Sequence, residues 1–150
     1  MHLANSLLPK ELSEARSHVL DAFANLEYAV AQAMKMADVE PGCAAAPLGQ
    51  KLEILASLKP GPKMSKAKAK IIADAASKAQ SLCEIRNDVV HNRMQLVAGH
   101  LNIAVYINIR AINQAYPQAR VLTVEKHNHL ADEAKAITDC INAWRLSDKR

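Results

Sequence analysis

A six-residue segment, residues 86–91, contains side chains whose types and spacing suit chemistry on a phosphate ester. Arg86 and Asn87 are adjacent in it, and His91 follows four residues later. Arginine carries a permanent, fork-shaped cation that matches phosphate oxygens. Histidine gains or loses a proton near neutral pH. The Asn87 amide can orient the imidazole or bind a ribose hydroxyl, so we take these three residues as the candidate catalytic group.

The spacing of these residues matters because the segment lies at the end of a long predicted helix. At about 100° per residue, Asn87 and His91 share a helix face, whereas Arg86 lies about 140° from His91. A frayed or tightened last turn brings Arg86 closer. The competing interpretation is a polar helix end, in which Arg86 pairs with Glu84 or Asp88 and His91 caps backbone carbonyls.

Three charged residues are candidate supports for this group. Glu27, in the middle of the first predicted helix, is positioned to reach Arg86 across a bundle; the alternative is a solvated surface glutamate. Asp88 lies two residues after Arg86. Arg93 follows Arg86 by seven residues, so on a continuous helix it shares the same face and either extends a phosphate site or remains a surface residue.

The net charge of +4 comes from one lysine-rich segment of the chain. Residues 54–73 contain five lysines and no acidic residue. Lys66 and Lys70 are the candidate substrate-binding residues among them, as contacts to nucleic-acid phosphates. The alternative is a solvated helix start, because lysines spaced two apart spread around a helix.

No metal site or cofactor is expected. His127 and His129 resemble a metal-binding pair, but no third ligand of suitable type stands at a supporting spacing. We expect both to be solvated at the start of the last helix. The sequence has no glycine-rich phosphate loop and no nucleophile elbow.

The composition predicts one domain, residues 1–150, built from closely packed helices. The chain has 27 alanines and only five aromatic residues, and alanine has the highest helix propensity. So few aromatics argue against a base-stacking platform. No apolar run approaches the roughly 20 residues of a membrane span. Three widely spaced cysteines and the absence of a signal-like start favour the cytoplasm; they are Cys43, Cys83 and Cys140.

The elements that would position the candidate residues follow from apolar periodicity. Four helices are predicted, at residues 10–38, 48–58, 65 to 93 or 94, and 128–145, with Ser65 and Asn128 as N-caps. Period-two alternation predicts strands at residues 95–98, 103–109 and 121–125, with a turn at Gly99 and His100. A helix over residues 102–116 is the open alternative. The predicted fold is a four-helix bundle with a small antiparallel β appendage between the third and last helices.

On these residues the sequence resembles the HEPN superfamily (higher-eukaryote and prokaryote nucleotide-binding domains). That family is marked by an arginine, an adjacent polar residue and a histidine about a turn later, near the end of a long helix. Arg86, Asn87 and His91 match the three positions in order. The resemblance implies a helical bundle that forms a homodimer, with the motifs of two copies meeting at a shared cleft.

The resemblance also implies a metal-independent endoribonuclease of toxin or defence type. In such an enzyme His91 would act as general base or acid, and Arg86 would stabilise the charge that develops at the phosphorus. An antitoxin or a nucleotidyltransferase is the partner protein implied. Many members are instead non-catalytic dimeric interaction or regulatory modules, and this is the alternative function.

Overall fold

The computed structural model describes residues 9–39, 46–107 and 119–147. Within these ranges the protein is mainly helical, with four helices and one three-stranded antiparallel sheet between the third and the last helix. The elements are α1 (Lys10–Met36), α3 (Leu48–Ala56), α4 (Lys66–His91), β1 (Met94–Val97), β2 (His100–Ile107), β3 (Ala119–Thr123) and α5 (Val124–Leu146). The predicted fold class is therefore confirmed.

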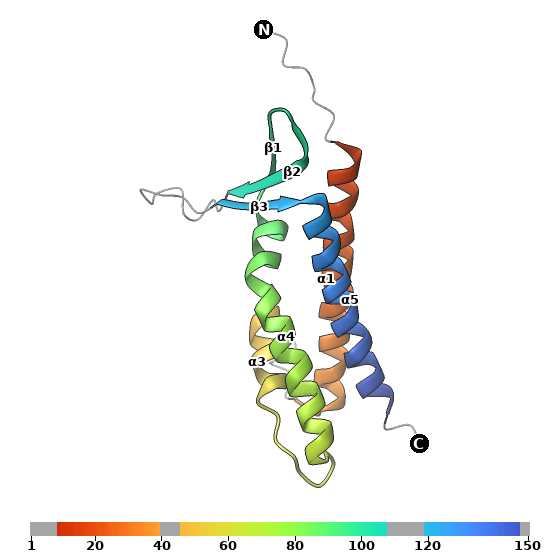
Figure 1. The fold of residues 1–150 in the computed structure, drawn as a ribbon. Helices are drawn as coiled ribbons and strands as arrows, with labels where there is room; N and C mark the ends of the chain where they lie inside the picture. The colour runs from red at the N-terminus through yellow and green to blue at the C-terminus, as the bar shows by residue number, and fades with distance from the viewer. Residues whose placement is uncertain (1–8, 40–45, 108–118, 148–150) are drawn as a thin grey trace.

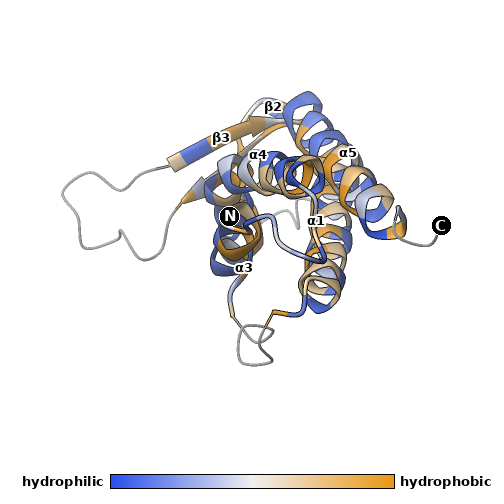
Figure 2. Ribbon diagram, turned by 90° about the horizontal axis from the view of Figure 1, so that it is seen from below, coloured by the Kyte–Doolittle hydropathy of each residue, from blue (hydrophilic) through white to orange (hydrophobic). Residues whose placement is uncertain are grey.

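The three long helices run side by side, and the short α3 lies against α4 (Figure 1). The apolar stripe predicted for the first helix is its buried face, because Leu12, Val19, Phe23 and Leu26 are all almost fully buried. In Figure 2, which views the bundle along its length, apolar and polar residues alternate along each helix. No helix in the described ranges is both long and apolar enough to cross a membrane.

The sheet lies at the end of the bundle where α4 ends and α5 begins (Figure 1). Its strand order is β1-β2-β3, with antiparallel pairing throughout. Gly99 takes a positive φ of 79° in the turn between β1 and β2, which glycine adopts without steric cost. Ala104 and Tyr106 on β2 are buried, so one face of this strand packs on the helices.

The helical alternative for residues 102–116 is wrong over the part that the structure describes, because residues 102–107 belong to β2. The predicted continuation of this strand to Ile109 and the remaining part of that helix lie outside the described residues. So does Cys43.

The start of α5 also differs from the prediction. The helix begins at Val124 instead of near Asn128, and Thr123 is its N-cap. The Thr123 hydroxyl oxygen accepts a hydrogen bond from the Lys126 backbone N–H at 3.1 Å. Glu125 is therefore helical and not the end of a strand. β3 runs directly into the helix because Thr123 has extended backbone angles and a capping side chain.

This earlier start places His127 inside the protein, so the expectation of a solvated His127 is wrong, whereas His129 is exposed. The Nδ1 atom of His127 lies 2.7 Å from the Thr123 carbonyl oxygen. Since a carbonyl only accepts, Nδ1 carries the proton and Nε2 accepts from the Tyr106 hydroxyl at 2.7 Å. Burial lowers the pKa of His127 below its usual 6.5 and raises the pKa of Tyr106 to about 12.

Candidate functional site

The sequence motif lies at the C-terminal end of α4, beside an open cleft. Ser65 caps the start of this helix as predicted, its hydroxyl accepting from the Lys68 N–H at 3.1 Å. The helix ends at His91, two or three residues before the predicted end. The cleft, of about 1370 Å³, lies between the start of α3, the end of α4 and strand β3, and the motif residues Arg86, Asn87 and His91 all line it.

Arg86 is held by two partners within the chain. Its Nη2 atom donates to the Glu27 carboxylate on α1 in an ion pair, which is one of the two alternatives that the sequence left open for Glu27. Its Nη1 atom donates to the Asn87 side-chain oxygen at 3.0 Å. The Arg86 side chain is only 17% exposed, whereas that of Glu27 is 40% exposed. The guanidinium is therefore fixed in orientation, with little of its surface open to solvent.

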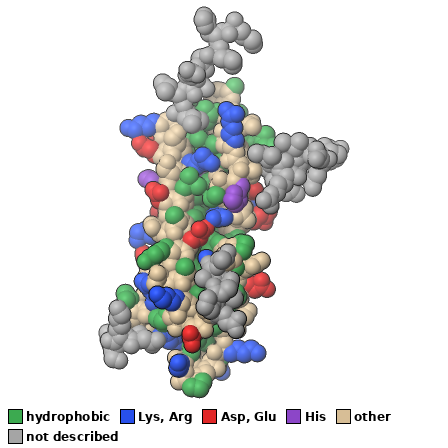
Figure 3. Space-filling model, turned by 180° about the vertical axis from the view of Figure 1, so that it is seen from behind, with side chains coloured by type: hydrophobic (Ala, Val, Ile, Leu, Met, Phe, Trp, Pro, Cys, Tyr) green, Lys and Arg blue, Asp and Glu red, His purple; other side chains and the backbone are tan. Residues whose placement is uncertain are grey.

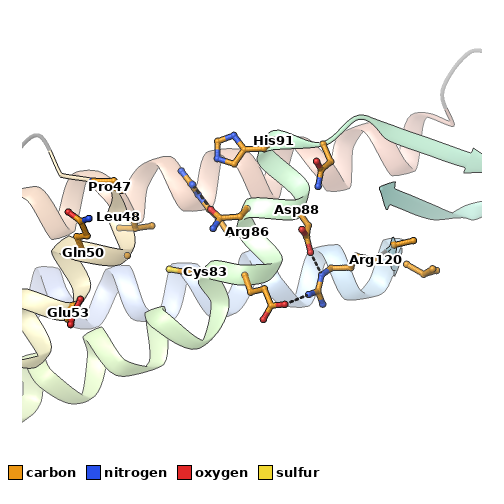
Figure 4. A pocket seen from close by; sticks show the side chains of 15 residues that line it. Pro47, Leu48, Gln50, Glu53, Cys83, Arg86, Asp88, His91 and Arg120 are labelled. Atoms are coloured by element: carbon orange, nitrogen blue, oxygen red, sulfur yellow. Dashed lines mark hydrogen bonds and ion pairs between the residues drawn. The ribbon is translucent and has the colours of Figure 1, made fainter. Parts of the chain in front are cut away.

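The competing interpretation required Arg86 to pair with Glu84 or Asp88, and the structure shows neither pair. Both carboxylates pair with Arg120 on β3 instead. Arg120 Nε donates to Asp88 at 2.6 Å. Arg120 Nη2 also lies 3.6 Å from a carboxylate oxygen of Glu84, which is a weaker ion pair. Figure 4 shows Asp88 pointing toward Arg120, while Arg86 and His91 extend from the same stretch of α4. The Asp88–Arg120 ion pair thus links strand β3 to the C-terminal end of α4.

His91 and Asn87 are exposed to the cleft. As the last residue of α4, His91 has its imidazole at the rim instead of in the core. A group at this place is reached by a ligand without any rearrangement of the bundle. The motif therefore combines an accessible proton-transfer group with an oriented cation beside it.

Arg93 does not extend this site. It lies beyond the end of α4, so the seven-residue spacing no longer places it on the face of Arg86. It is exposed and is not among the residues that line the cleft. The helix stops earlier than predicted because Asn92, its C-cap, has an extended backbone that leads directly into β1.

Lys66 and Lys70 lie at the opposite end of α4 from the motif. Lys70 and His91 are 21 residues apart on the helix, which corresponds to a distance of about 30 Å along its axis. Lys70 is exposed and pairs with Asp74 at 3.0 Å, and Lys66 is also exposed. The structure does not bring these lysines to the cleft. On the face drawn in Figure 3, acidic and basic side chains are interspersed.

The remaining cleft wall is mixed in character. Pro47 and Leu48 at the start of α3 are apolar, and Glu53 adds a negative charge. Burial raises the pKa of the Cys83 thiol, with Arg86 opposing the shift, so this thiol is not an activated nucleophile. In the described ranges no cluster of three or more His, Cys, Asp or Glu side chains is arranged to hold a metal ion.

Three contributors to the site were missed from the sequence: Arg120, Cys83 and the start of α3. Their neighbours in the sequence do not indicate that they line the cleft. Arg120, for example, is 32 residues from its partner Asp88 in the chain. Only the pairing of β3 with β2 brings it to the helix end.

The Arg86–Glu27 pair is expected to stabilise the fold modestly. We predict a coupling free energy of about 1 kcal/mol from a double-mutant cycle of Arg86→Ala and Glu27→Ala, because the arginine is mostly buried and its partner is partly exposed. Urea unfolding measures it. The exposed Lys135–Asp139 pair, at 2.8 Å, is the control, with an expected coupling of at most about 0.5 kcal/mol. Equal couplings in the two cycles would contradict the prediction.

Comparison with models of known protein families gives no match, and neither a curated protein nor a solved structure matches the chain.

Proposed function

We propose that this protein is a HEPN-like, metal-independent endoribonuclease whose site is the cleft at the end of α4. The observation that carries the proposal is the placement of an exposed His91 on the same cleft as Asn87 and the oriented Arg86. This combination provides a proton-transfer group and a fixed cation for one phosphodiester. The resemblance of the motif supplies the reaction class.

In the proposed reaction the ribose 2′-hydroxyl attacks the adjacent phosphorus. A bond forms between O2′ and phosphorus while the bond from phosphorus to O5′ breaks, leaving a 2′,3′-cyclic phosphate and a free 5′-hydroxyl. One base takes the 2′-hydroxyl proton, and one acid protonates O5′. His91 performs one of these transfers, and Arg86 stabilises the added negative charge on the phosphoryl oxygens.

Arg86 has to share its guanidinium with the substrate in this scheme. The contact to Asn87 is a hydrogen bond to a neutral amide, whereas the contact to Glu27 is an ion pair. A phosphate oxygen is a stronger acceptor than an amide oxygen. We therefore expect the phosphate to displace Asn87 while Glu27 keeps the arginine in place, leaving the Asn87 amide free for a ribose hydroxyl.

A homodimer completes the proposal, because one histidine per chain serves only one of the two proton transfers. The same histidine of a second copy supplies the other across a shared cleft. An antitoxin or a nucleotidyltransferase is the proposed partner protein. We place the activity in the cytoplasm, where the free thiols of Cys83 and Cys140 persist.

The test is to incubate the purified protein with RNA in EDTA and to identify the ends of any products. Cleavage that yields cyclic phosphate and 5′-hydroxyl ends supports the proposal, and light scattering should give the mass of two chains. Intact RNA after long incubation, or products with 5′-phosphate ends, rejects it.

The second candidate function is a non-catalytic dimeric interaction or regulatory module. It is favoured by the engagement of Arg86 with Glu27 and Asn87, since the chain itself occupies both ends of the guanidinium. In that case the motif serves as a hydrogen-bond network between helices. A dimer that binds RNA or a partner protein without cutting RNA would identify it.

Substitution of both Lys66 and Lys70 by alanine is expected to leave RNA cleavage within about twofold of wild type. Along α4, Lys70 lies about 30 Å and Lys66 about 38 Å from His91, and Lys70 already pairs with Asp74. Initial rates at two salt concentrations measure this. A loss of tenfold or more at low salt that becomes smaller at high salt would instead assign the lysines to the RNA-binding surface, because the variant would then have fewer phosphate contacts and a weaker salt dependence.

A further inference from the structure

The C-terminal turn of α4 depends on a side chain from another helix. The last four carbonyls of a helix have no partner within it. In α4 the carbonyl of Asp88 is satisfied by the Asn92 N–H at 3.2 Å. The carbonyl of Val89 is satisfied by Arg16 Nη2, which reaches it from α1 at 3.0 Å.

Arg16 makes a second contact just beyond the helix. The same Nη2 atom donates to the Asn92 carbonyl oxygen at 3.3 Å. His91 therefore lies between two backbone carbonyls, those of Val89 and Asn92, that one guanidinium holds together. The positive charge also suits the negative end of the helix dipole.

The surroundings of Arg16 make this contact hard to replace. Val89 and Asn92 are both buried, and the Arg16 Nε atom is itself shut off from solvent. The buried Tyr106 and His127 pair lies beside the guanidinium, whose charge influences the pKa of both. If the guanidinium is removed, the carbonyl of the buried Val89 loses the donor that satisfies it, and a buried acceptor without a partner is unfavourable.

From this geometry we infer that Arg16 is the positioning residue of the site, which sets the direction of the His91 imidazole by capping the end of α4. Arg16 does not line the cleft, so its role would be exerted through the backbone of α4. The catalytic consequence rests on the proposed function, whereas the effect on the helix end does not.

The test compares Arg16→Met with a control at the other end of the same helix. Trp144 Nε1 donates to the Lys68 carbonyl oxygen at 3.0 Å, so Trp144→Phe also removes one hydrogen bond between helices, but far from His91. Hydrogen exchange of the amides of residues 89–92 should be at least tenfold faster in Arg16→Met than in Trp144→Phe. The His91 imidazole signals in NMR spectra should shift only in Arg16→Met, and Arg16→Lys should restore them in part.

RNA cleavage provides the catalytic readout. In Arg16→Met we expect kcat to fall about tenfold with KM within twofold, and Arg16→Lys to recover part of the rate. If wild type does not cut RNA, the proposed function fails, but the exchange and NMR results still decide the role of Arg16. Exchange and His91 signals that match those of Trp144→Phe would overturn the inference.

Discussion

Replacing His91 with alanine is expected to reduce RNA cleavage by at least about 100-fold, because positioned proton transfer contributes roughly 10²–10⁴ to rates. The fold should be unaffected. His91 is exposed, and exposed substitutions change the unfolding free energy by only about 0.5 kcal/mol. The two quantities are measured as initial rates in EDTA and as urea unfolding curves.

His129→Ala is the matched control for this experiment. His129 is also exposed, and it lies on α5, where it pairs with Glu133 at 2.9 Å. Its replacement should leave the cleavage rate unchanged. Equal cleavage by wild type, His91→Ala and His129→Ala would show that any nuclease activity comes from elsewhere and would remove His91 from the mechanism.

The largest effect on stability is expected at His127. His127→Ala leaves a cavity and deprives the buried Tyr106 hydroxyl of its acceptor, so the unfolding free energy should fall by about 3 kcal/mol at pH 7.5. The difference in unfolding free energy between wild type and His127→Ala should become smaller as the pH is lowered. Burial lowers the pKa of His127 in the fold below 6.5, so below that pH the unfolded chain binds a proton that the folded chain does not.

The sign follows from proton linkage. The stabilisation by neutral His127 is complete above about pH 6.5 and is lost as the pH falls through 6.5 toward the lower pKa of the folded state. The loss has a limiting slope of about 1.4 kcal/mol per pH unit. Urea unfolding of wild type and His127→Ala at pH 7.5, 6 and 5 measures it, with His129→Ala as control. Parallel pH profiles for wild type and His127→Ala would contradict this account of the buried pair.

The helices were predictable because the information for them is local. The apolar stripe of α1 and the Ser65 cap of α4 are read directly from the spacing and type of neighbouring residues. The N-cap of α5 was predicted five residues too late, at Asn128 instead of Thr123. Both Thr123 and Asn128 are good caps, and the choice between them depends on where β3 pairs with β2.

The site was predictable only in part. The motif residues were selected from type and spacing. The sequence left open whether Glu27 reaches Arg86 or is solvated, and the packing of α1 against α4 decided for the ion pair. The pairing of Asp88 with Arg120 was not predictable, since an acid beside a motif gives no indication of which distant strand supplies its partner. The same holds for the carbonyl contacts of Arg16.

By itself, the sequence determined the helical bundle and the types of side chain present at the end of α4, because helical periodicity, capping and side-chain type act within a few residues. Tertiary structure alone decided that Arg86 and Arg120 are paired with carboxylates. It also decided that His91 is exposed whereas His127 is buried, and that α4 ends at His91. His91 and His127 are the same residue type in polar segments of the chain. They differ because His91 ends a helix at an open cleft, whereas the early start of α5 turns His127 toward Tyr106.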